Sequence, residues 1–216
     1  MRRVLAVAVG LVVLVSSGDA RQMTGLGRWK SFTDMRSVRA IARSGDSVWA
    51  ATNGGVFLYN AAVGNQFSKF TNSEGLSSND VTAATLDRYG RLWVGTAEGF
   101  VNVYTPSQRQ WKEIRGIAES NRVQKTIRTL YAYNDSLFIG TDFGVVVYRM
   151  QREEFGDTYA NLGFLQQPKV NDIIIHRNTI WVATESGVAS ASLASPNLSA
   201  PSAWTRYPAG TSASSN

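Results

Sequence analysis

The 216-residue sequence contains no cysteine and only one histidine. The absence of cysteine excludes a lipid-modified cysteine, a disulfide framework and any thiolate metal site. The one histidine, His176, lies in an isoleucine-rich segment, where we expect a structural role because catalysis needs positioned partners. No pair of histidine or acidic residues has metal-ligand spacing. We therefore expect no enzymatic activity, no metal and no cofactor.

A long membrane-spanning run is also missing near the N-terminus, where the apolar segment Val4–Val15 is much shorter than the roughly 20 residues that cross a bilayer. Arg2 and Arg3 precede this segment, and the small residues Gly18 and Ala20 follow it. A basic start, a short apolar stretch and small residues at the −3 and −1 positions are typical of a cleaved signal peptide. The sequence predicts that residues 1–20 are a signal peptide and that the protein is exported.

One eight-residue pattern is written four times: an aromatic residue, an apolar or small residue, glycine or alanine, and threonine, with a glycine three residues later. The copies start at Trp49, Trp93, Phe138 and Trp181, which lie 44, 45 and 43 residues apart. A period in the low forties with strand-like units and no helical pattern is typical of a β-propeller. We expect an all-β fold built from four-stranded antiparallel blades, with about four blades present.

Each repeat divides into four strands, A to D from the propeller axis outwards, because alternating apolar residues are separated by turn-forming glycine, asparagine and aspartate. The strands expected are Val38–Ala42, Val48–Ala51, Val56–Tyr59 and Phe67–Phe70 in blade 1; Val81–Leu86, Leu92–Gly95, Val101–Tyr104 and Trp111–Ile114 in blade 2; Ile127–Tyr133, Leu137–Gly140, Val145–Tyr148 and a strand within Thr158–Phe164 in blade 3; and Val170–His176, Ile180–Ala183, Val188–Leu193 and Trp204–Tyr207 in blade 4.

The number of outer strands carries a further expectation, because Trp29–Phe32 precedes blade 1 and resembles a surplus outer strand. Propellers commonly close by pairing an N-terminal strand with the last blade. We therefore expect residues 29–207 to form an open arc within a larger, about seven-bladed propeller, whose remaining blades belong to a missing C-terminal part of the same polypeptide. We also expect residues 21–28 to be a polar lead and residues 208–216 to be a flexible end at a truncation point. The alternative is a closed four-bladed ring with Trp204 in a tail.

Blade 2 resembles a known repeat. The run from Glu74 to Val81, followed by Asp87–Thr96 and Gly99, is similar to the two-component regulator propeller repeat, a WD40-like unit. A narrower similarity, carried by Trp29–Phe32, Ser37–Ile41 and Gly54–Tyr59, is to the N-terminal propeller of type IX secretion-associated (PorZ-like) surface proteins. That resemblance implies two large propellers, a C-terminal sorting domain, and work in attaching anionic lipopolysaccharide to secreted cargo.

The resemblance places the protein in the periplasm, at the outer-membrane surface or outside a Gram-negative cell, as a non-enzymatic binding or scaffold module with secretion-system proteins as partners. The main alternative is the periplasmic ligand-sensing propeller of a hybrid two-component histidine kinase, which uses the same repeats. A propeller lyase or glycosidase is a third possibility, and it would need clustered histidine, tyrosine and acidic residues on one face.

The best binding candidate is the basic segment Arg109–Arg128, which contains the long loop Gly116–Lys125 between strand D of blade 2 and strand A of blade 3. The formal net charge of +6 is compatible with an anionic polysaccharide or lipopolysaccharide, whereas an exported protein is not expected to meet nucleic acid. In a propeller the D–A loops and B–C turns share one face. The residues expected near one another there are Arg122, Lys125, Asn53, Glu98, Asp142 and Glu185.

The threonine and glycine of every repeat have a different expected role. Glycine permits a positive φ in the B–C turn, and the threonine hydroxyl can bond within that turn. Because these residues recur in every blade, we expect them to belong to the scaffold and not to a ligand site.

The signal-peptide prediction has a direct test. We expect N-terminal sequencing of the protein purified from its own envelope fraction to begin at Arg21. A chain that begins at Met1 or Arg2 would show that residues 1–20 are retained.

Overall fold

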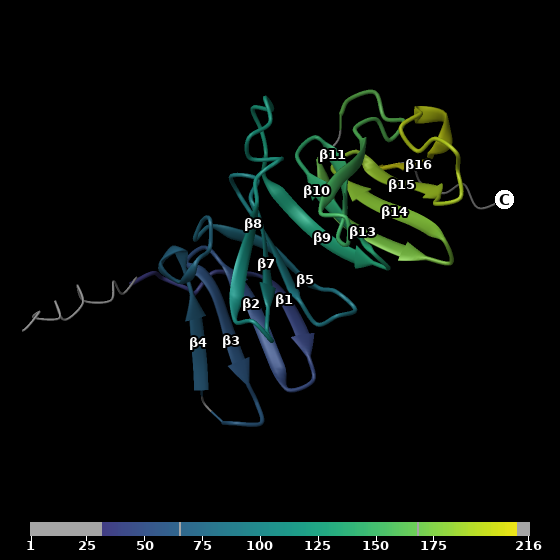
Figure 1. The fold of residues 1–216 in the computed structure, drawn as a ribbon. Helices are drawn as coiled ribbons and strands as arrows, with labels where there is room; N and C mark the ends of the chain where they lie inside the picture. Colours follow the sequence, from purple (N-terminus) through teal and green to yellow (C-terminus); the bar gives the residue numbers. More distant parts are fainter. Residues whose placement is uncertain (1–31, 65, 168, 211–216) are drawn as a thin grey trace, which may run out of the picture.

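The structure is a computed structural model that describes residues 32–64, 66–167 and 169–210. It consists of four separate four-stranded antiparallel sheets, each formed by consecutive strands (Figure 1). The blades are β1 (Val38–Ser44), β2 (Ser47–Thr52), β3 (Gly55–Asn60) and β4 (Gln66–Phe70); β5 (Val81–Leu86), β6 (Leu92–Thr96), β7 (Val101–Thr105) and β8 (Gln110–Ile114); β9 (Ile127–Tyr133), β10 (Ser136–Thr141), β11 (Gly144–Arg149) and β12 (Glu154–Tyr159); and β13 (Val170–His176), β14 (Thr179–Thr184), β15 (Gly187–Ser192) and β16 (Thr205–Pro208). The predicted propeller of four-stranded blades is confirmed.

The outer strands of blades 3 and 4 differ from the expected bounds. β12 begins at Glu154, four residues before the segment in which we expected it, because the four-residue turn Met150–Glu153 closes the β11–β12 hairpin, with Glu153 at φ 56°. β16 begins at Thr205, because Trp204 caps the short 3₁₀ helix η2 (Pro201–Ala203). The expected strand Trp29–Phe32 lies outside the described residues, except for the exposed Phe32.

The four blades form an open arc. The inner strands follow one another in space, with β1 against β5, β5 against β9 and β9 against β13. Blades 1 and 4 lie at opposite ends of the arc (Figure 1). β16 pairs with β15 through Val188 opposite Tyr207, so the strand after Trp204 belongs to blade 4 and is not a tail. The expectation of an open arc is confirmed, and the closed ring is wrong.

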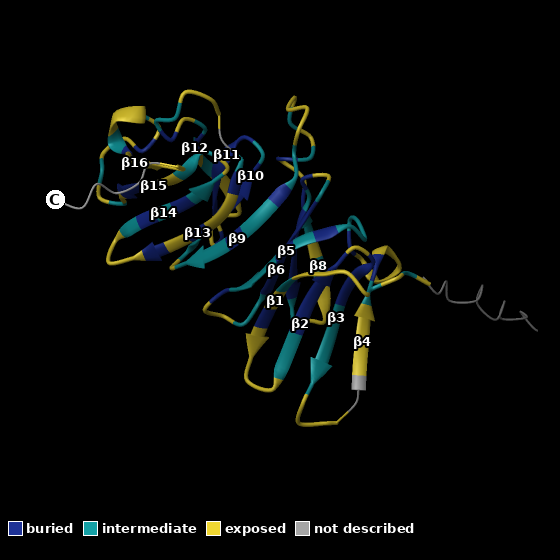
Figure 2. Cartoon of the chain, turned by 180° about the vertical axis from the view of Figure 1, so that it is seen from behind, coloured by how far each residue is buried: buried dark blue, intermediate teal, exposed yellow. Residues whose placement is uncertain are grey.

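The hydrophobic core lies between blades, in three layers. Figure 2 colours the buried residues of the strands dark blue. The aromatic residue that starts each repeat packs against the following blade: Trp49 lies in the layer between blades 1 and 2, Trp93 in that between blades 2 and 3, and Phe138 in that between blades 3 and 4. At the ends of the arc this cover is missing, so Ile41 is 66% exposed and Ile174 is 55% exposed.

The B–C turns confirm the scaffold role of the repeated threonine. In blade 3 the hydroxyl of Thr141 donates to the carbonyl oxygen of Gly144 at 2.9 Å and accepts from the backbone N–H of Phe143 at 3.1 Å. The turns of blades 1 and 4 form the same two bonds through Thr52 and Thr184. Gly144 has φ 121°, and a Cβ there would lie 2.3 Å from the carbonyl oxygen of Tyr159. The threonine and the glycine thus have structural roles within the turn.

The A–B turn of blade 2 is organised by Asp87, whose side chain is fully buried. One carboxylate oxygen accepts from the backbone N–H groups of Tyr89 and Arg91 at 2.9 and 3.0 Å. The other accepts from Arg91 Nε at 2.6 Å and from the indole N–H of Trp93 at 2.9 Å. Gly90 completes the turn at φ 73°. Asp87 therefore fixes the turn and also holds Arg91 and Trp93 in place.

Removal of that carboxylate should be costly. We expect Asp87→Ala to lower the free energy of unfolding by about 3 kcal/mol, because it leaves the indole N–H of Trp93 buried without a partner and Arg91 without its counter-ion. Asp46→Ala, in the equivalent turn of blade 1, is the control: Asp46 is exposed, so its change should stay within about 0.5 kcal/mol. Urea denaturation measures both. Equal losses in the two variants would contradict this role of Asp87.

Candidate functional site

The turns after the repeated threonines lie on one face of the arc, which we call the B–C face and define by Asn53, Glu98, Asp142 and Glu185. Backbone hydrogen bonds tie these turns to the starts of the inner strands. The N–H of Asn53 donates to the carbonyl oxygen of Ser37 at 3.3 Å, and that of Glu185 to Lys169 at 3.4 Å. The D–A loops, which lead into the inner strands, therefore open on the same face.

Three of the six predicted site residues line one cavity of about 570 Å³ on this face: Glu98, Lys125 and Asp142. Glu185 lies beside it, paired at 3.5 Å with the cavity residue Lys169. Asn53 is exposed on blade 1 and does not line this cavity.

Arg122, the sixth predicted residue, lines a smaller cavity instead. Its guanidinium carbon lies 4.8 Å from the ring centroid of Phe143, at a cation–π distance. The cavity beside it has a volume of about 280 Å³ and is lined by Ile117 and Phe155 among others. The long loop thus holds Arg122 against Phe143 of blade 3, away from the cavity that Lys125 lines.

The charges around the larger cavity nearly balance. Arg128 pairs with Asp142 at 3.2 Å and reaches across to Asn171 of the next blade at 3.2 Å. Lys125 donates to the carbonyl oxygen of Ala118 within its own loop. Neither Arg122 nor Lys125 forms an ion pair with a carboxylate in the described part of the chain. These two cations of the loop therefore keep charge available for a partner.

Sequence reasoning placed Arg128 only within the basic segment Arg109–Arg128 and did not find Lys169, and each of these two residues forms an ion pair on this face. A signal for Arg128 is its place as the second residue of an inner strand. Arg39 holds the same position in blade 1 and pairs with Asp80 of blade 2, as Arg128 reaches blade 4. Thr82 of blade 2 likewise donates to the carbonyl oxygen of Ile127 in blade 3. Residues at this position connect one blade to the next.

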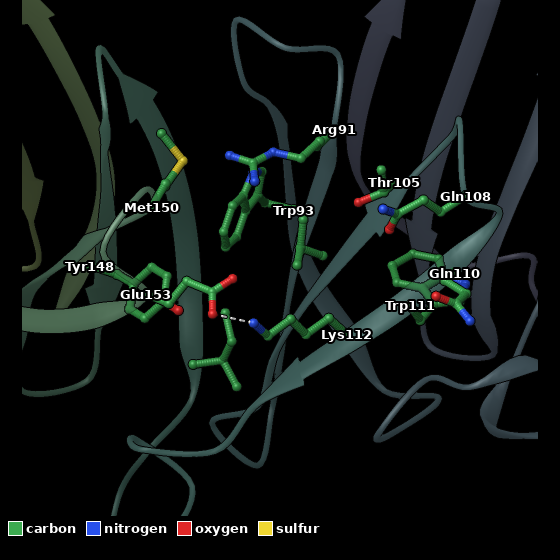
Figure 3. A pocket seen from close by; sticks show the side chains of 12 residues that line it. Arg91, Trp93, Thr105, Gln108, Gln110, Trp111, Lys112, Tyr148, Met150 and Glu153 are labelled. Atoms are coloured by element: carbon green, nitrogen blue, oxygen red, sulfur yellow. Dashed lines mark ion pairs between the residues drawn. The ribbon is translucent and has the colours of Figure 1, made fainter.

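A third cavity, of about 610 Å³, lies between blades 2 and 3; we call it the lateral pocket (Figure 3). Blade 2 contributes Arg91, Trp93 and Lys112, and blade 3 contributes Tyr148 and Glu153. Lys112 and Glu153 form an ion pair across the pocket (Figure 3). Its residues are spread over more than sixty positions of the sequence, from Arg91 to Glu153, so no local motif predicts the pocket.

Two groups in the lateral pocket have shifted pKa values. A hydrogen bond from Lys112 lowers the pKa of Glu153, which therefore stays ionised. Burial raises the pKa of Tyr148, with the negative charge of Glu153 adding to the effect, so its hydroxyl stays protonated at neutral pH. The pocket thus presents a carboxylate acceptor beside a phenol that can donate and accept.

The described ranges contain no metal-binding cluster. No group of three histidine, cysteine, aspartate or glutamate residues there could hold a metal ion. His176 is exposed at the end of β13 and not enclosed by the core. None of the helices within the described residues has the length and apolar character needed to cross a bilayer.

The fold is that of a partial propeller, with cavities on its B–C face and between blades 2 and 3. The family model for the N-terminal β-propeller domain of PorZ, a type IX secretion protein, matches residues 48–205. The chain belongs to this family, which confirms the resemblance seen in the sequence.

Solved structures agree on the fold. PorZ from Porphyromonas gingivalis, described as an essential bacterial surface component of the type IX secretion system, superposes with a TM-score of 0.69 at 17% identity, over 84% of this chain and 24% of that one. The extracellular domain of a B. thetaiotaomicron protein described as a hybrid two-component system, BT4673, gives 0.66 at 18% identity, over 80% and 22%. That of BT3049, from the same organism, gives 0.58 at 23%, over 71% and 21%.

These similarities have a limited reach. Identities of this size show the fold alone, and the chain spans about a quarter of the length of the PorZ structure. No curated protein matches the chain.

Proposed function

We propose that the chain is an exported, non-enzymatic binding and scaffold module of a type IX secretion-associated surface protein. The observation that carries this proposal is the match of residues 48–205 to the PorZ N-terminal propeller family. The predicted signal peptide supports export. The repeated threonines and glycines form hydrogen bonds and backbone conformations within the turns, which supports a scaffold role for them. Unrepeated residues then remain for contacts with partners.

The proposed ligand on the B–C face is an anionic glycan, such as an acidic polysaccharide or lipopolysaccharide. Arg122 and Lys125 are the contacts, because both lie on the long D–A loop and neither is neutralised by a carboxylate in the described residues. The paired charges below them, among them Arg128 with Asp142, fix the shape of the site and contribute little net charge. Secretion-system proteins at the outer membrane are the proposed macromolecular partners.

Arg122→Ala/Lys125→Ala tests the ligand assignment by titration with an acidic polysaccharide. We expect affinity to fall about 3- to 10-fold at low salt, because exposed charge contacts contribute about 0.2–1 kcal/mol each. At high salt the variant and the wild type should converge, because the Debye length shrinks from about 30 Å at 0.01 M to about 3 Å at 1 M.

The matched control is Arg43→Ala/Arg177→Ala, which removes the same charge from exposed residues at or beside A–B turns, at the opposite end of the strands. It should retain most of the affinity. Equal affinity in wild type and loop variant at both salt concentrations would remove the loop from the site.

The second candidate, a periplasmic ligand-sensing propeller of a hybrid two-component kinase, is favoured by the TM-score of 0.66 to the BT4673 extracellular domain. Location separates the two candidates. We expect a membrane-impermeant amine reagent to label the protein on intact cells, for example at exposed Lys69. Labelling only after the outer membrane is opened would favour the periplasmic sensor.

A further inference from the structure

The lateral pocket exists because one aromatic ring is missing from the wedge between blades 2 and 3. The equivalent wedge between blades 1 and 2 is filled by four rings, from Trp49, Phe70, Tyr104 and Trp111, with neighbouring centroids 5.0–5.7 Å apart. Phe70 lies opposite Val56 in its blade.

The residue opposite the matching valine of blade 2, Val101, is Ile114. Ile114 therefore stands where blade 1 has a phenylalanine ring. The ring pair Trp93 and Tyr148 remains, at 5.9 Å, but the space beside it is open (Figure 3). A wedge that the repeat fills elsewhere with apolar rings is here a cavity of about 610 Å³, within the range of about 300–1,000 Å³ usual for small-molecule sites.

Polar groups without protein partners line this cavity. Tyr148 is only 3% exposed, yet its hydroxyl has no hydrogen bond within the described residues. The Nε of Arg91 bonds Asp87, whereas its two terminal nitrogens have no partner there. The side chains of Gln108 and Gln110 are likewise unbonded in the described ranges. The indole N–H of Trp111, which also lines the cavity, is buried without a hydrogen-bond partner in the described residues. Buried polar groups are normally hydrogen-bonded, so this N–H calls for a partner from outside the chain.

The charges of the pocket cancel. Lys112 is paired with Glu153, and Arg91 is paired with Asp87 at 2.6 Å. No net charge is left for a free anion or a metal cation. What remains is a mixture of donors and acceptors: guanidinium and amide N–H groups, amide oxygens, a carboxylate and a phenol. Such a set matches a ligand with many hydroxyl groups, each of which both donates and accepts.

The apolar floor fits the same ligand. Trp93, Val103 and Met150 lie between the polar groups, and the guanidinium of Arg91 covers the indole of Trp93 at 5.2 Å. A sugar ring has an apolar C–H surface and a rim of hydroxyl groups, so one such unit would use both parts of the lining.

We propose that the lateral pocket is a saccharide-binding site, taking a neutral, hydroxyl-rich sugar unit with its ring on the Trp93 side and its hydroxyl groups on Arg91, Gln110 and Tyr148. This site is separate from the B–C face and independent of the function proposed for that face.

Saturation-transfer NMR of the purified full chain tests the site with neutral oligomers of glucose, mannose and galactose at millimolar concentration. We expect at least one of them to bind. Tyr148→Phe and Gln110→Ala should each weaken it about 2- to 10-fold, the effect of losing one hydrogen bond. Ile114→Phe restores the ring that the neighbouring wedge has and should abolish binding while leaving the melting temperature unchanged or higher.

Gln151→Ala is the control, because this exposed glutamine lies at the same blade interface but bonds Tyr89 and Asp135 outside the pocket. It should bind like the wild type. No binding by any neutral oligomer, or binding that is unchanged in both Tyr148→Phe and Ile114→Phe, would overturn the proposal. Arg122→Ala/Lys125→Ala should leave neutral-sugar binding intact and Tyr148→Phe should leave acidic-polysaccharide binding intact, so the two sites fail separately.

Discussion

The spacing of the blades depends on one close contact, between the small third residue of each repeat and the first branched residue of the next inner strand. An added Cβ on Gly95 would lie 2.3 Å from Cγ2 of Ile127, and one on Gly140 would lie 2.7 Å from Cγ1 of Val170. Both distances are shorter than packed carbon atoms tolerate. A larger side chain at either glycine would push neighbouring blades apart and open the buried layers on both sides of the contact.

The last blade shows how burial changes where this contact is absent. Trp181 and Ala183 occupy the positions of Trp93 and Gly95, but no described blade follows them, and both are only partly buried. Trp181 instead stacks on Tyr207 of its own blade at 5.8 Å. Blade 4 therefore has the same apolar surface, with Trp181 and Ala183, that the following blade covers in blades 1 to 3. Burial in this fold comes from the neighbouring blade and not from the blade itself, as expected for repeat architectures.

The sequence predicts roles that are local to one turn, and it misses roles that depend on irregular strands or on the path of a long loop. Positions written in every repeat, such as Thr141 and Gly144, could be assigned correctly because their roles are local to one turn. β12 was misplaced because its aromatic residues, Phe155 and Tyr159, are interrupted by Gly156 and Asp157 and do not alternate. On the B–C face, propeller topology alone predicts that Lys125, Glu98 and Asp142 lie close together. The contact of Arg122 with Phe143 depends instead on the path of a ten-residue loop, which topology does not determine.

The lateral pocket was out of reach for a further reason: it is defined by a departure from the repeat and by the angle between two sheets. Ile114 belongs to no sequence motif. That it replaces an aromatic ring is visible only from the strand register, in which Phe70 holds the same position in the preceding blade. Positions that repeat are held by the blade contacts and turns, so they cannot vary without cost. Positions that break the repeat, such as Ile114, are where the scaffold leaves a cavity. In this arc the repeated residues hold the turns and the blade contacts, and the proposed sites take most of their polar contacts from unrepeated residues.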